Sequence, residues 1–182
     1  MKVYLTNQAK YFINHLKYFK SKAVIKYNKL CLNEKISLIE INSSKSFNQL
    51  DTTFFWDYKI FPNNIMGFIT EWTCENRSMQ IGDTIVQQAY IPPIRGFSQK
   101  IIFGVRINNI IKEKNRIGFS YETLIGHVEM GESTFTIEKT FEGKTIFKIH
   151  TFSKPGNWLT RLVGPFFQFL IKHIVPTRRL KT

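Results

Sequence analysis

One stretch decides the fold: it reads GFSYETLIGHVEMGESTFTIE, from Gly118 to Glu138. Between Arg116 and Ile125, apolar and aromatic residues alternate with polar ones, as in a strand with one buried face. Gly126 and Gly131 then bracket a turn, and alternation resumes from Ser133 to Glu138. The stretch therefore predicts two strands joined by a loop. Side chains that can do chemistry are densest here.

The same alternation extends outward in both directions along the chain. Glu142-Gly143 is a turn signal that predicts a hairpin from the second strand into Thr145–Phe152. Upstream, the pattern predicts strands at Ile101–Ile111 and at Thr84–Ile91, the latter stopped by Pro92-Pro93. A further strand is expected at Ile36–Ile41.

Helical spacing is found near both ends of the chain. Apolar residues recur every three to four positions in Ala9–Lys20, which predicts a short helix, and Ser46 is a suitable cap for another at Ser46–Leu50. After Pro155-Gly156, the apolar face of Asn157–Ile174 predicts an amphipathic helix of about 27 Å, kinked at Pro165. We therefore expect a single α+β domain over residues 1–182. Its curved, mostly antiparallel sheet would wrap around the long C-terminal helix.

Composition limits the class of protein. Hydrophobic residues make up 43% and aromatic residues 15% of the 182 residues, which excludes a disordered chain. The 26 Lys+Arg against 13 Asp+Glu give a net charge of +13, which favours nucleic acid, anionic lipid or acidic ligands as partners. An AT-rich genome, which favours Lys, Asn, Ile and Phe codons, is the alternative explanation for this bias.

Cysteine usage and hydropathy indicate a compartment. The two cysteines, Cys31 and Cys74, lack the spacing of a disulfide framework or a thiolate metal site. The N-terminus lacks the apolar core of a signal peptide, and the apolar run Leu162–Val175 is too short and too interrupted to span a bilayer. A soluble, cytoplasmic protein is therefore expected.

Gly118–Glu138, the Phe152-Ser153-Lys154-Pro155 step and the later Gly164-Pro165 pair together resemble a known family. It is the family of domain of unknown function 1990, whose hallmark is similar to GFxYGTLxGHPExGEExF followed by FSxP and a helix with a GP pair. Eleven residues match, as does a weaker step at Ile81-Gly82-Asp83: Gly118, Phe119, Tyr121, Thr123, Leu124, Gly126, His127, Glu129, Gly131, Glu132 and Phe135. The resemblance covers residues 69–175, whereas residues 1–60 diverge from the family.

The chain departs from this hallmark at four positions. Glu122 replaces a Gly, Ile125 and Val128 stand where Pro is usual, and Ser133 replaces a second Glu. The family pattern is also similar to that of START-like helix-grip proteins, in which a sheet and a long helix enclose an apolar ligand. The resemblance thus implies a cavity between sheet and helix.

The loop residues admit three interpretations. His127, Glu129 and Glu132 could hold a metal, but HxExxE is a loose pattern. They could instead contact a ligand. In the third interpretation, His127 hydrogen-bonds to loop backbone and Glu132 pairs with a Lys or Arg. We expect no metal and no cofactor. Tyr121 and Glu122 should point to opposite faces of their strand.

The leading hypothesis is a binder of a small apolar or amphipathic molecule between sheet and helix. Ten aromatic residues, including Trp56 and Trp72, are candidates to line the cavity, although core packing explains each one separately. The predicted ligand contacts are Tyr121, Thr123, His127, Glu129, Glu132 and Trp158.

Two alternatives to ligand binding stay open. One is an enzyme in which His127 with Glu132 or Glu122 forms an acid/base pair in the same cavity. The other is a basic surface that binds nucleic acid or an anionic membrane. Its candidate segments are Lys10–Phe12, Lys17–Lys20 and Arg178–Lys181, which equally fit a solvated helix face and a basic tail. The sequence predicts no oligomeric state.

Overall fold

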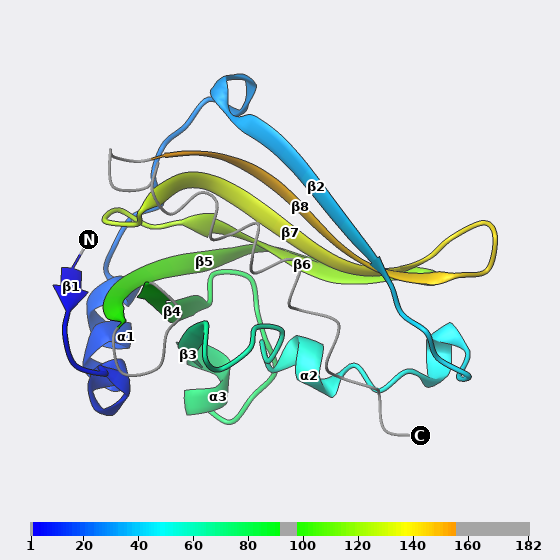
Figure 1. The fold of residues 1–182 in the computed structure, drawn as a ribbon, viewed down its shortest axis with the longest axis horizontal. Coiled ribbons are helices and arrows are strands. Elements are labelled where there is room, and N and C mark those ends of the chain that lie inside the picture. Colours follow the sequence, from blue (N-terminus) through cyan, green and yellow to red (C-terminus); the bar gives the residue numbers. More distant parts are fainter. Residues whose placement is uncertain (1, 92–97, 156–182) are drawn as a thin grey trace.

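The computed structural model describes residues 2–91 and 98–155, which form one curved, twisted sheet with short helices on both of its faces (Figure 1). The sheet has eight strands in the order β2-β8-β7-β6-β5-β4-β3, with β1 paired to β5. All of these pairs are antiparallel. The strands are β1 (Lys2–Tyr4), β2 (Asn33–Glu40), β3 (Met66–Thr70), β4 (Thr84–Ile91), β5 (Gln99–Glu113), β6 (Arg116–Thr123), β7 (Glu129–Lys139) and β8 (Thr145–Pro155).

All six predicted strands are confirmed, as β2 and β4–β8, and every one except β4 has shifted ends. β4 has the predicted bounds, whereas β5 is longer than predicted and has an irregularity in its pairing with β6 between Ile107 and Asn109. The predicted hairpin is β7–β8, and Gly143 in its turn has a φ of 82°, a left-handed conformation that glycine adopts without steric cost. Strong alternation on a half-buried sheet thus located the strands correctly.

The helices are short. They are α1 (Phe12–Lys20), α2 (Thr53–Trp56), α3 (Glu71–Cys74) and the 3₁₀ turns η1 (Ala9–Tyr11), η2 (Lys29–Cys31) and η3 (Phe47–Gln49). The predicted helix at 9–20 is confirmed as η1 continued by α1, and the one at 46–50 as η3. In η3, the Ser46 backbone N–H and hydroxyl both donate to Gln49 Oε1, over 3.3 and 2.9 Å.

Each face of the sheet has its own core. On the concave face, side chains of β4–β8 pack against the segment that carries α2 and β3, with Phe55, Tyr58, Phe119 and Phe135 in the centre. On the convex face, α1 packs on β4 and β5 through its three buried apolar residues: Phe12, Leu16 and Phe19. Gly104 permits this approach, since a Cβ there would lie 2.7 Å from the Phe19 ring.

The prediction of a sheet wrapped on a long C-terminal helix is wrong. Within residues 2–91 and 98–155, the only helix longer than four residues is α1, which lies near the N-terminus, and the concave face is filled by residues of the N-terminal half. The aromatic side chains of Phe55, Tyr58 and Phe61 supply the buried surface that the helix-grip prediction assigned to the other end of the chain. The predicted helix Asn157–Ile174 lies outside the described residues.

None of the helices in the described part of the chain is long and apolar enough to cross a membrane.

Candidate functional site

A row of polar side chains crosses the concave face inside the aromatic core. Gln87 of β4 donates through Nε2 to the Tyr58 hydroxyl, and Ser133 of β7 lies 3.1 Å from the Thr151 hydroxyl of β8. Tyr121 of β6 stands between them, with its ring 6.4 Å from that of Tyr58. The sheet therefore carries hydrogen-bonding groups where its core is otherwise apolar.

Burial keeps the two phenols of this row protonated. It raises the pKa of Tyr58 and of Tyr121, and hydrogen bonds from Tyr58, Gln87 and Ser133 only partly oppose the effect at Tyr121. Tyr58 is fully buried and has a φ of 61°, an uncommon conformation for a bulky residue. Tyr58 follows the C-cap of α2, where its backbone N–H donates to the Phe55 carbonyl over 3.1 Å, and its side chain packs against the surrounding aromatic rings.

His127 lies in the loop between β6 and β7, packed edge-on against Phe103 with ring centroids 4.4 Å apart. His127 Nδ1 lies 2.9 Å from both the backbone nitrogen and the backbone carbonyl oxygen of Glu129, so it accepts from the N–H in one tautomer and donates to the carbonyl in the other. Burial lowers the pKa of His127 to about 3, so the ring is neutral at physiological pH. This is the backbone hydrogen bond that one of the three interpretations predicted.

Thr123 and Glu129 lie at the two ends of the loop that carries His127, on the concave side of the sheet. The Thr123 hydroxyl accepts from the Gly131 N–H over 3.1 Å and donates to the Gly131 carbonyl over 3.3 Å, which fixes β6 against β7. Burial raises the pKa of the Glu129 carboxyl, while Ser153 and Lys35 pull it down. Glu129 is thus a half-buried acid on the same side of the sheet as Tyr121.

Glu132 lies on the opposite, convex face. It is directly across from Glu122 in the β6–β7 pair, and the Tyr27 hydroxyl lies 2.7 Å from Glu122 Oε1 and 3.3 Å from Glu132 Oε2. Lys29 also binds Glu132, which is the lysine pairing that the same interpretation predicted. Desolvation and the two carboxylates raise the pKa of Tyr27. Residues of the divergent N-terminal portion therefore satisfy Glu122, a position where the chain departs from the hallmark.

The predicted contact residues are thus divided between two faces. Tyr121, Thr123, His127 and Glu129 lie together on the concave side, whereas Glu132 and Glu122 lie on the convex side. His127 consequently forms no acid/base pair with either carboxylate, and its Nδ1 is already bonded. No group of three metal-ligating side chains occurs within the described ranges. Trp158 lies outside them.

A groove of about 650 Å³ opens beside the concave core. It runs between α2, the segment after α3 and the ends of strands β5 and β6, and we call it the tryptophan groove. Its lining residues are Thr52, Thr53, Trp56, Asp57, Trp72, Arg77, Ser78, Met79, Ile110, Lys112, Glu113 and Ile117. Sequence reasoning named the two tryptophans as pocket candidates but gave no signal for the charged residues, which come from three separate segments.

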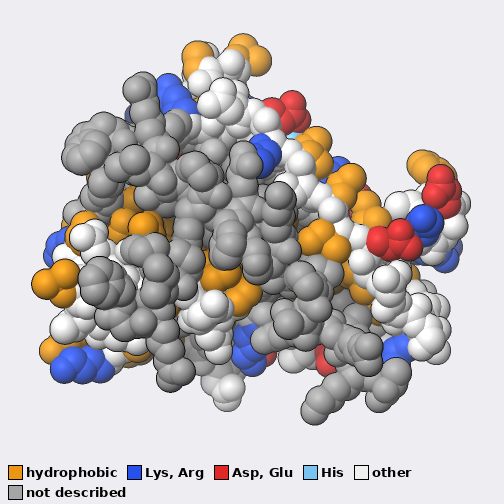
Figure 2. All heavy atoms as spheres, viewed as in Figure 1, with side chains coloured by type: hydrophobic (Ala, Val, Ile, Leu, Met, Phe, Trp, Pro, Cys, Tyr) orange, Lys and Arg blue, Asp and Glu red, His pale blue; other side chains and the backbone are white. Residues whose placement is uncertain are grey.

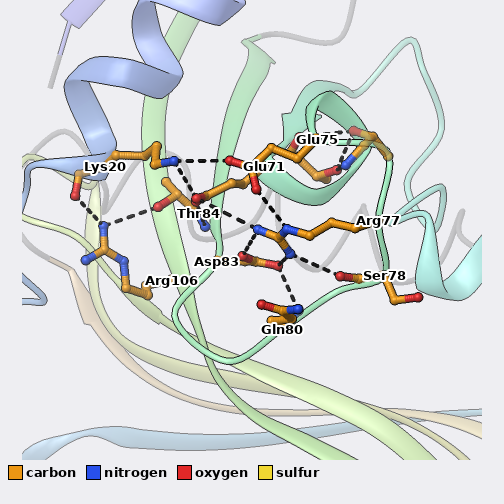
Figure 3. A network of polar contacts seen from close by, with 11 residues as sticks. Lys20, Glu71, Glu75, Arg77, Ser78, Gln80, Asp83, Thr84 and Arg106 are labelled. Atoms are coloured by element: carbon orange, nitrogen blue, oxygen red, sulfur yellow. Dashed lines mark hydrogen bonds and ion pairs between the residues drawn. The ribbon is translucent and has the colours of Figure 1, made fainter.

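Two sets of contacts hold the groove wall in place. Trp72 Nε1 donates to the Trp56 carbonyl over 3.1 Å, joining α3 to α2. Arg77 donates to both Asp83 oxygens over 2.8 and 2.6 Å and through Nε to Glu75 over 2.8 Å (Figure 3). Asp83 is buried and also accepts from the Gln80 N–H. The Asp of the predicted Ile81-Gly82-Asp83 step thus organises the approach to β4.

The same network reaches α1 across the sheet edge. Glu71 accepts from the Thr84 backbone N–H over 3.0 Å and pairs with Lys20 over 2.5 Å (Figure 3). Arg106 donates to the carbonyls of Phe19 and Lys20 over 3.2 and 3.0 Å, which caps the C-terminus of α1. Hydrogen bonds and ion pairs therefore connect the wall of the groove to helix α1 on the convex face.

Comparison with known proteins gives two matches. The family model described as "Domain of unknown function (DUF1990)" matches residues 57–179. A "UPF0548 protein" of Deinococcus radiodurans is 35% identical over 60 residues, which cover 33% of this chain and 30% of that protein. The matched segment thus spans about a third of the curated relative. Nine of the twelve residues that line the tryptophan groove lie inside the family match, whereas Thr52, Thr53, Trp56 and α1 lie before it.

Proposed function

The chain belongs to the family of domains of unknown function DUF1990, and we propose that it binds a small amphipathic molecule in the tryptophan groove. The observation that carries the proposal is the groove itself, about 650 Å³ and lined by two indoles beside a rigid core. Ligand sites in proteins are concave, of about 300–1,000 Å³, and mostly apolar with a few fixed polar groups. The volume of the groove lies in this range, and its lining combines five apolar side chains with seven polar or charged ones.

Its lining also indicates the class of ligand. Trp56, Ile110 and Ile117 are partly exposed and offer flat or apolar surface, whereas Trp72 and Met79 are buried in the wall. The four charged side chains of the lining, two acidic and two basic, balance one another: Asp57, Glu113, Arg77 and Lys112. Such a groove favours a flat molecule that is neutral or zwitterionic over one with a strong net charge.

Arg77 supports this choice of ligand. Its Nε and both terminal nitrogens already donate to Glu75, Asp83 and the Ser78 carbonyl. Because these contacts compensate the guanidinium, Arg77 shapes the wall without acting as a strong anion receptor. The ligand contacts predicted from the sequence at Tyr121, Thr123, His127 and Glu129 stay a prediction. Two of these residues, His127 and Thr123, already make hydrogen bonds within the protein.

The test uses Nile red, a neutral, flat and amphipathic dye, as the probe. With the wild-type protein, we expect the emission of the dye to rise and to shift to the blue. The bound dye should also quench the tryptophan fluorescence of the protein, with a stoichiometry of one to one. The variant Ser78→Trp places a large ring on the exposed rim of the groove, and should weaken dye binding at least about tenfold, because most of the apolar contact is lost.

Ser44→Trp is the matched control. Ser44 is exposed and lies outside the groove, so this variant adds the same indole without filling the site. Circular dichroism should show all three proteins folded. Equal dye affinity in the wild type, Ser78→Trp and Ser44→Trp would refute the proposal, because the dye would then bind elsewhere.

A further inference from the structure

Helix α1 presents an exposed stripe that the tryptophan groove does not use. The helix buries Phe12, Leu16 and Phe19 against the convex face of the sheet. The opposite side of α1 exposes 48% of Ile13 and 43% of Tyr18, and Tyr11 of the preceding turn η1 is 42% exposed. The exposed Lys10 and Lys17 and the partly exposed Lys22 flank these side chains. We define the α1 stripe, which includes residues just before and after the helix, as Lys10, Tyr11, Ile13, Lys17, Tyr18 and Lys22.

The stripe lies in the most basic part of the chain. Residues 1–33 contain seven lysines and no Asp or Glu. Lys20 pairs with Glu71 and Glu75, and Lys29 pairs with Glu132. Within the described residues, no carboxylate forms an ion pair with the other five, which are Lys2, Lys10, Lys17, Lys22 and Lys26. Figure 2 shows lysine or arginine side chains next to apolar ones at the lower left, where α1 lies in Figure 1.

The lysines lie over the exposed aromatic rings. Lys10 Nζ is 4.9 Å from the centre of the Tyr11 ring, and Lys2 and Lys22 are 4.9 and 4.4 Å from that of Tyr18. Binding of single-stranded nucleic acid relies on open ring faces on which bases stack. Here ammonium groups occupy those faces, which disfavours nucleic acid as the partner.

Lysine, tyrosine and an exposed isoleucine together match a lipid headgroup region. Tyrosine prefers the membrane–water boundary, lysine is attracted to anionic headgroups, and an apolar side chain gains by entering the acyl boundary. We propose that the α1 stripe binds the surface of a membrane that contains anionic phospholipid. The proposal is independent of the groove, which lies beside the core of the other face.

The stripe is presented by a rigid helix. Arg106 caps its C-terminus, and Lys20 ties it to Glu71 (Figure 3). Because α1 has only nine residues, binding should be shallow, reversible and dominated by charge. α1 precedes residues 57–179, so the surface is a feature of this chain outside the family match.

Vesicle co-sedimentation of the full-length protein tests the proposal. We expect binding to vesicles of about one part phosphatidylglycerol to three parts phosphatidylcholine, no binding to phosphatidylcholine alone, and loss of binding as salt is raised to about 0.5 M. The triple variant Lys10→Gln/Lys17→Gln/Lys22→Gln should bind about 100-fold more weakly, at about fivefold for each lysine. Ile13→Ser should weaken binding severalfold, which is a smaller loss than that of the triple variant.

The control variant removes the same charge elsewhere. Lys45, Lys114 and Lys139 are exposed, lie outside α1 and form no ion pair within the described ranges. Lys45→Gln/Lys114→Gln/Lys139→Gln should retain most of the binding. Equal loss in the two triple variants would overturn the α1 stripe as the site. Absence of vesicle binding together with tight binding of an oligothymidine would overturn the membrane in favour of nucleic acid.

Discussion

At the scale of single residues, His127 makes the stability of the protein depend on pH. Burial lowers its pKa from 6.5 to about 3, so between these values the unfolded chain binds a proton that the folded protein excludes. The free energy of unfolding therefore falls as pH falls below 6.5. When the pH is lowered from 7.5 to 5, this one group should reduce the free energy of unfolding by about 2 kcal/mol.

The variant His127→Asn isolates this effect. The Asn side chain can accept the Glu129 N–H through Oδ1, a contact that Nδ1 makes in one tautomer, but it does not titrate. Urea unfolding at the two pH values should show that the wild type loses about 2 kcal/mol more than the variant. Titration of Glu129, whose pKa is raised, is common to both proteins. Parallel losses would mean that His127 is protonated in the folded state.

Local pattern predicted part of this residue chemistry. It indicated that Tyr121 and Glu122 face opposite sides, that loop backbone could hold His127 and that Glu132 could pair with a lysine, and each is found. It did not indicate that Tyr27 would bond to Glu122 and Glu132. That contact joins positions about a hundred residues apart, and strand alternation carries no information about which distant segment covers a face.

At the scale of elements, the strands followed from alternation, while the helices that fill the concave face did not. α2 and α3 have four residues each, too few for a helical period to be visible. The apolar period at 157–174 indicates a helix with a buried face but not its packing partner. The α+β prediction therefore assigned the concave face to the wrong end of the chain, although Phe55 and Tyr58 fill it.

The close approach of β7 to β8 depends on Gly131. Its φ is +143°, and a Cβ there would lie 1.9 Å from the Phe152 carbonyl oxygen. Gly131→Ala should therefore lower the free energy of unfolding by at least about 3 kcal/mol, because both backbone strain and a clash with main chain arise.

Gly143 in the β7–β8 turn is the matched control. Its φ is +82°, but nothing lies within 4 Å of a Cβ there, so Gly143→Ala should cost only about 1 kcal/mol. Chemical denaturation of both variants measures the difference. Similar losses of free energy of unfolding in the two variants would show that the Phe152 main chain can move to accept a Cβ at position 131. The close spacing of β7 and β8 would then not depend on Gly131.

Asp83 should stabilise the junction between α3 and β4. Asp83→Asn removes the carboxylate that binds Arg77 twice and accepts from the Gln80 N–H, and should cost about 2 kcal/mol. The exposed pair Asp57–Lys59 provides the comparison, since Asp57→Asn should cost less than about 0.5 kcal/mol. Thermal unfolding that ranks the two variants in the reverse order would contradict the role given to Asp83.

At the scale of the whole molecule, the two faces of one sheet carry different surfaces. The concave side holds the aromatic core, the polar row of Tyr121 and the tryptophan groove, and the convex side carries the basic α1 stripe. The Lys20–Glu71–Arg77–Asp83 network joins them (Figure 3). The sequence predicted aromatic lining and a basic surface, but only the fold places them beside different cores.

The most direct test of the central claim is native mass spectrometry of the protein incubated with a library of neutral and zwitterionic aromatic compounds. We predict one-to-one adducts with the wild type and with Ser44→Trp that are lost in Ser78→Trp, because that ring fills the groove. Adducts that persist in Ser78→Trp, or their absence from the folded wild type, would contradict ligand binding in the tryptophan groove.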